Sequence, residues 1–82
     1  MTKTKEAATE FLRSVADDVQ HQRYGGLSLF DRARCELDPS QRGAAWSLVV
    51  RATKAARTST GMAEFEVLLE AAQLIEDGEV AP

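Results

Sequence analysis

The segment from residue 61 to residue 78, GMAEFEVLLEAAQLIEDG, carries more apolar surface than a helix on the outside of a small protein needs. At about 100° per residue, one apolar face covers about 120° of such a helix. It comprises Phe65, Leu68, Leu69, Ala72 and Ile75. A second face, formed by Val67, Ala71 and Leu74, widens the apolar arc to roughly 220°, whereas an outer helix needs only about 100°. The segment therefore predicts a helix over 61–77 whose second face is covered by the chain's own helices or by another chain.

Apolar residues recur at spacings of three and four through the rest of the chain, and no stretch shows the alternation typical of a strand. The spacing predicts further helices over about 5–23, 29–37 and 39–57. Thr4 is the expected N-cap of the first helix, Pro39 starts the third, and Gly78 follows the last, ahead of a frayed EVAP tail. The predicted fold is all-α, a small bundle of three long helices and one short helix, in a single domain over residues 1–82.

The length of the chain, 82 residues, limits the core that it can form. A chain of this size buries only about 60% of its unfolded surface, so additional stabilisation is expected from a disulfide, a metal or a second chain. Cys35 is the only cysteine, which excludes a disulfide within the chain, and His21 and Cys35 are the only soft metal ligands. We therefore expect no metal and no cofactor. Association with another chain is then the remaining source of additional stabilisation.

Catalytic chemistry is not expected, because Cys35 and His21 lie on different predicted helices with no orienting motif around them. The first residues, MTKTKEAATEF, lack the apolar region of a signal peptide, and the longest nearly apolar run, GAAWSLVV, is too short to span a bilayer. These features predict a cytoplasmic protein. A chain rich in Ala and Arg, with no Asn and a single Ile, is typical of GC-rich bacterial or phage coding sequences.

Two apolar surfaces are candidate contact sites for a partner. The first is the second face of the last helix, formed by Val67, Ala71 and Leu74. The second comprises Trp46 and Val50, which lie off the core face of the predicted 39–57 helix. A self-complementary apolar stripe most simply makes a homodimer. The leading hypothesis is a small non-enzymatic protein–protein interaction module, an accessory or regulatory protein that self-associates or binds and modulates a partner protein.

The charges are divided between the last two predicted helices. Residues 39–60 contain four basic residues and no acids, whereas residues 61–82 contain six acids and no bases. A basic stripe on the predicted 39–57 helix comprises Arg51, Lys54 and Arg57. In one interpretation it faces the acids of the last helix, Glu66, Glu70 and Asp77. In the other it contacts phosphate, and the alternative hypothesis is therefore a DNA-binding transcriptional regulator. The net charge of −3 argues against a general nucleic-acid or anionic-membrane binder.

Overall fold

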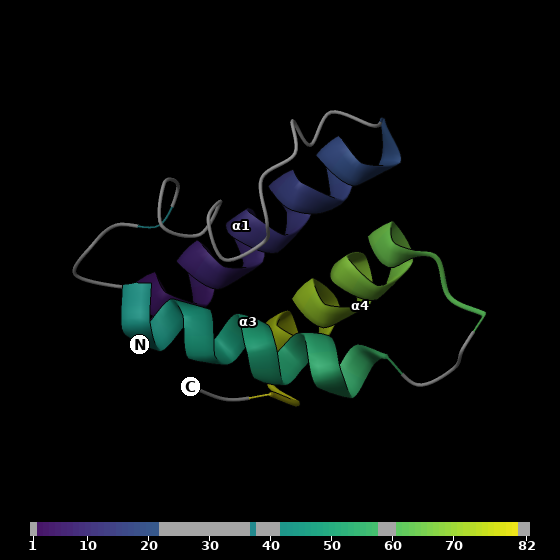
Figure 1. Ribbon diagram of the computed structural model, residues 1–82. Helices are drawn as coiled ribbons and strands as arrows, with labels where there is room; N and C mark the ends of the chain where they lie inside the picture. The colour runs from purple at the N-terminus through teal and green to yellow at the C-terminus, as the bar shows by residue number, and fades with distance from the viewer. Residues whose placement is uncertain (1, 22–36, 38–41, 58–60, 81–82) are drawn as a thin grey trace.

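The described part of the protein is mainly α-helical. The structure is a computed structural model that describes residues 2–21, 37, 42–57 and 61–80. Within these ranges it contains three helices and no strand: α1 (Thr2–Gln20), α3 (Arg42–Ala56) and α4 (Glu64–Glu76), labelled as in Figure 1. The prediction of an all-α fold is confirmed. The short helix predicted over 29–37 lies outside the described residues, apart from Leu37, which is buried.

The observed helix ends differ from the predicted ends at several points. Helix α1 begins at Thr2, so Thr4 lies inside the helix and is not its N-cap; Thr4 is buried, and packing on this face explains the extra length. The third helix is described from Arg42 and ends at Ala56, while residues 39–41 lie outside the described residues. Helix α4 begins at Glu64 with Ala63 as its N-cap residue, and no side-chain hydrogen bond caps it.

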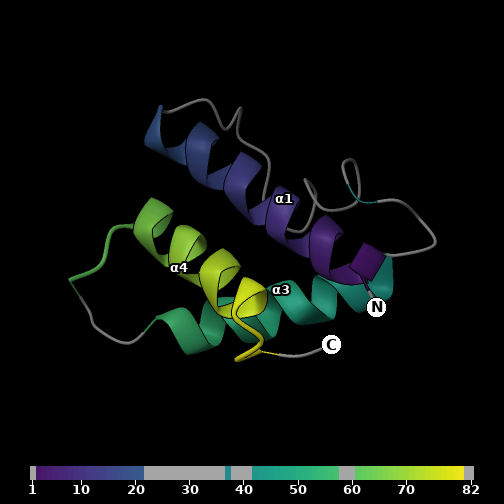
Figure 2. The ribbon, with the colours of Figure 1, turned by 180° about the vertical axis from the view of Figure 1, so that it is seen from behind.

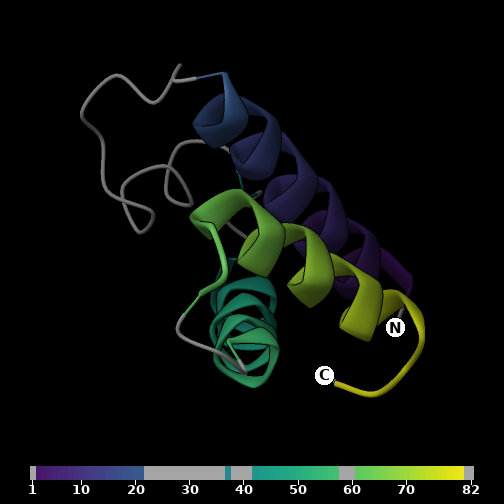
Figure 3. The same ribbon diagram turned by 90° about the vertical axis from the view of Figure 1, so that its right-hand side faces the viewer.

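Helix α4 contacts both other helices. Helices α1 and α4 run antiparallel and side by side, as Figures 2 and 3 show. Their interface is the most extensive among the described helices. Helix α3 packs against both of them and is seen nearly end-on in Figure 3. Since α4 has a neighbour on each of two sides, it needs an apolar surface wider than that of a helix with a single neighbour.

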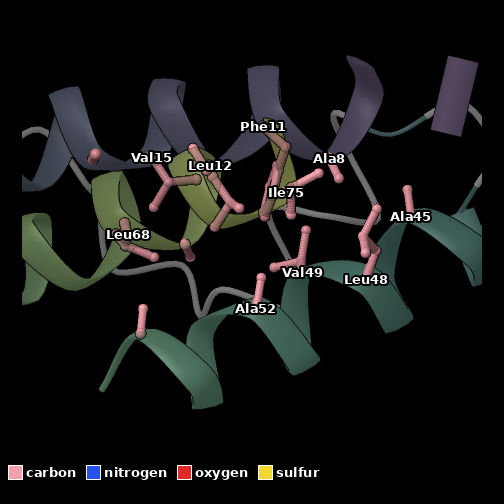
Figure 4. Packing of buried hydrophobic residues seen from close by; sticks show 14 of the residues in the cluster. Ala8, Phe11, Leu12, Val15, Ala45, Leu48, Val49, Ala52, Leu68 and Ile75 are labelled. Carbon is pink, nitrogen blue, oxygen red and sulfur yellow. The ribbon is translucent and has the colours of Figure 1, made fainter. Parts of the chain in front are cut away.

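The core is formed by side chains from all three helices. Figure 4 shows Phe11, Leu12 and Val15 of α1 and Val49 and Ala52 of α3 directed toward residues of α4. The largest fully buried side chains are those of Leu12, Leu48, Val49, Val67, Leu68 and Ile75. Several alanines are also fully buried, and their small side chains allow the helix backbones to approach closely: Ala8, Ala45, Ala52, Ala71 and Ala72.

Helix α4 ends in a Schellman motif. Gly78 adopts a left-handed conformation with φ of 80°, its N–H donates to the carbonyl oxygen of Ile75 (3.1 Å), and the N–H of Glu79 donates to that of Leu74 (3.0 Å). This matches the expected role of Gly78. The chain then turns back, so that Val80 is half-buried against the core. The expectation of a frayed tail is therefore corrected for residues 79 and 80.

Candidate protein-interaction surface

The second apolar face of α4 is covered by the chain itself. Val67 is 1% exposed and Ala71 is fully buried, while Leu74 is half-buried and packs against the core. The cause is the position of α4, which packs against α1 and α3 at once and uses both of its apolar faces. Of the two alternatives that the sequence left open for this face, the structure shows coverage by the chain's own helices at Val67 and Ala71. Of the three residues, only Leu74 keeps part of its surface accessible.

The outer side of α3, by contrast, exposes apolar surface. Val50 is 45% exposed, and Trp46, one turn earlier, is half-buried. Both residues line an open depression along the helix, together with Val49, Thr53, Lys54 and Arg57. The Thr53 hydroxyl donates to the carbonyl oxygen of Val49 on its own helix (2.7 Å), so it does not require a partner in the depression. The structure thus brings the predicted patch of Trp46 and Val50 together with two residues of the predicted basic stripe.

The basic residues along α3 differ in their surroundings. Arg57 donates two hydrogen bonds to Glu64 at the start of α4, Nη1 to Oε2 and Nη2 to Oε1, both at 3.2 Å. Lys54 and Arg51 are exposed. Asp77, one of the acids expected to face the stripe, accepts a hydrogen bond from Gln73 of its own helix (3.0 Å). Neutralisation between α3 and α4 is therefore seen at Arg57, with Glu64 as the acid.

Leu69 is a surface residue that the sequence reasoning assigned to the core face. It is 44% exposed on the outer side of α4, and together with Val50 it makes up the exposed large hydrophobic residues of the described chain. One turn before Leu69, the side chain of Phe65 is half-buried. The polar residues near Leu69 are exposed: Glu66, Glu70 and Gln73. The signal was present in the sequence, because Leu69 lies at the edge of its apolar face and next to Glu66 and Gln73 on the helix surface.

The polar edge where α4 meets α1 carries an ion pair between Arg13 and Glu76. The hydrogen bond from Arg13, and then the positive charge of Arg13, hold the pKa of the Glu76 carboxyl below its usual value. Both side chains are close to half exposed, so the pair is screened by solvent. It is a surface link between α1 and α4.

His21 and Cys35 are the two residues that the sequence offers as a base and a nucleophile. His21 is exposed at the end of α1, where its Nδ1 lies 2.8 Å from the carbonyl oxygen of Asp17. Cys35 lies outside the described residues. Residues 2–21, 37, 42–57 and 61–80 contain no group of three or more His, Cys, Asp or Glu side chains placed to hold a metal ion. In the same ranges, no helix combines the length and the apolar character needed to cross a membrane.

Comparison of the chain with models of protein families, with curated protein sequences and with solved structures gave no match.

Proposed function

We propose that this protein is a small, non-enzymatic protein–protein interaction module that contacts its partner through the outer side of α3. The observation that carries the proposal is the exposure of Val50, at 45%, beside Trp46 in the open depression along that helix. Fully burying a Val side chain is worth roughly 1.5–3 kcal/mol, and a partner that covers this surface regains part of that free energy. Trp is also among the residues that most often dominate the binding energy of protein interfaces.

The residues around the depression define the chemistry of the partner. Lys54 and Arg57 line it, and the sequence from residue 39 to residue 60 holds no acid. A protein segment that presents an apolar side chain flanked by carboxylates would complement both the apolar floor and the basic rim. By binding such a segment, an accessory protein of bacterial or phage type would modulate the protein that carries it.

The alternative, a DNA-binding regulator that uses Arg51, Lys54 and Arg57, has less support. Two donors of Arg57 are directed to Glu64 and not to solvent. A surface that binds DNA contacts phosphate mainly through polar groups, whereas this surface exposes the apolar Val50. A mobility-shift assay on duplex DNA separates the alternatives, because phosphate contacts strengthen as salt is lowered. A shift at low salt that is lost on Lys54→Ala would favour DNA over protein as the ligand.

The test of the proposed function is site-specific photo-crosslinking in the native host. A photoreactive amino acid at position 50 is expected to yield a covalent adduct with another protein, whereas the same residue at exposed position 14 of α1 is not. Changing Lys54→Glu in the position-50 protein should reduce the yield of the adduct, because it places an acid opposite the carboxylates of the partner. Equal labelling from positions 50 and 14, or no adduct from position 50, would refute α3 as the contact surface.

A further inference from the structure

We infer that the α3 surface can be occupied by α4 of a second copy of this chain, so that the protein self-associates head to tail. The inference rests on the proposed function and names a partner for the same site. The α3 patch comprises Trp46, Val50 and Lys54, and the α4 patch comprises Leu69, Glu66 and Glu70. The two patches lie on different helices of one chain, and each is largely exposed.

The apolar parts of the two patches are well matched in kind and exposure. Val50 is 45% exposed on α3 and Leu69 is 44% exposed on α4, each next to a half-buried aromatic residue one turn away: Trp46 for Val50 and Phe65 for Leu69. No other large hydrophobic side chain of the described residues is exposed to this degree. A contact between the two patches would therefore remove from water the largest exposed hydrophobic side chains of the described chain.

The charged residues around the two apolar side chains determine which patches can contact each other. Val50 is bordered by Lys54 in a stretch without acids. Leu69 is bordered by Glu66, with Glu70 further round the helix, in a stretch without bases. Two α3 patches facing each other would bring like charges together, as would two α4 patches, and such contacts are unfavourable. The pairing of α3 with α4 places opposite charges around both apolar side chains.

A contact between two different patches has a consequence for assembly. Each copy offers one α3 patch and one α4 patch, so a pair formed by one contact leaves one patch of each kind open. The assembly is then able to add further copies until its contacts close into a ring, and its mean mass rises with concentration. This differs from a two-fold dimer, whose mass reaches a limit at two chains.

The test uses two variants that each inactivate one patch. Val50→Asp disables the α3 patch and Leu69→Lys disables the α4 patch, and both positions are exposed enough to accept a charge. Ser14→Asp and Ser14→Lys, on the exposed side of α1, are controls of matched charge. Sedimentation velocity at protein concentrations up to about 1 mM detects dissociation constants in the millimolar region. Under these conditions the native protein and the controls should associate. Each variant alone should remain monomeric, with self-affinity lowered at least about tenfold.

The decisive sample is an equimolar mixture of Val50→Asp and Leu69→Lys. It should form a 1:1 pair that does not grow, because one variant supplies an intact α4 patch and the other an intact α3 patch. The pair should weaken between about 50 mM and about 500 mM NaCl, since salt screens the charges of the rims. Circular dichroism confirms that both variants are folded.

Several outcomes would overturn the inference. A native protein that stays monomeric would do so, and so would a mixture that does not pair. Dimers of Leu69→Lys alone would indicate contact between two α3 patches, and dimers of Val50→Asp alone contact between two α4 patches. The proposed function fails separately: if the purified protein is monomeric but position 50 crosslinks to another protein in the host, only the self-association is refuted.

Discussion

Val67 and Val50 are the same amino acid on adjacent helices, yet the first is 1% exposed and the second 45%. Helix α4 conceals Val67 and Ala71 of its second apolar face and exposes Leu69 at the edge of its first face, whereas α3 exposes Val50. The difference arises from position in the bundle. Helices α3 and α4 each contact the other two described helices, but Val67 lies on a face of α4 that is part of the core, whereas Val50 lies away from the core side of α3. Exposure is therefore determined by the placement of neighbours and cannot be obtained from the width of an apolar arc.

The largest expected effect comes from placing the same charge at both valines. Val67→Asp should abolish folding, because an unpaired carboxylate in the core costs several kcal/mol and a small domain has only about 5–15 kcal/mol of total stability. Val50→Asp should fold normally, because its side chain reaches water. Circular dichroism during thermal melting checks both variants. A folded Val67→Asp protein would mean that the second face of α4 is accessible in solution, and the contrast between the two helices would be lost.

A smaller effect is expected when volume is added without charge. Ala71 is fully buried where α4 meets its neighbours, and Ala55 on α3 is exposed. Ala71→Leu should lower the free energy of unfolding by about 1–3 kcal/mol through overpacking, and Ala55→Leu should change it by less than about 0.5 kcal/mol. Urea denaturation of the two variants provides the measurement. Equal stability changes would show that α4 is less tightly enclosed than its burial indicates.

The smallest effect is expected at the polar edge of α4, where Arg13 lowers the pKa of Glu76. The pKa of Glu76 is lower in the folded protein than in the unfolded chain, so the ionised carboxylate stabilises the fold. This stabilisation is fully present above pH 4.5, the ordinary pKa of the group, and is lost as the pH falls through the lowered pKa. Glu76→Gln should thus be slightly less stable than the native protein at neutral pH and equally stable in acid. Urea titrations across that range test this, and in an Arg13→Ala background the substitution should have no effect. A pH-independent difference would contradict the assignment.

The sequence was sufficient to predict the helical class, the approximate positions of the three described helices and most of their core residues, because these depend on the local spacing of apolar side chains. It also predicted Gly78 as the residue that ends α4, since the left-handed conformation there favours glycine. It could not establish how the helices pack against one another, and that arrangement determines whether Val67 and Ala71 are covered. Leu69 belongs to the first apolar face of α4 in the sequence, but it lies at the edge of that face and is exposed. The Trp46 and Val50 patch was identified because both residues lie off the core face of α3.

The pairing of α1 with α4 also bears on how the chain is made. Among the described helices these two form the most extensive interface, but they are separated by more than forty residues of sequence. A nascent chain on the ribosome therefore cannot complete this interface until α4 has emerged from the exit tunnel, and the apolar side of α1 lacks its main cover until then. Contacts between such distant segments slow folding relative to bundles whose successive helices pack on one another. During synthesis, the apolar side of α1 is thus a surface prone to aggregation.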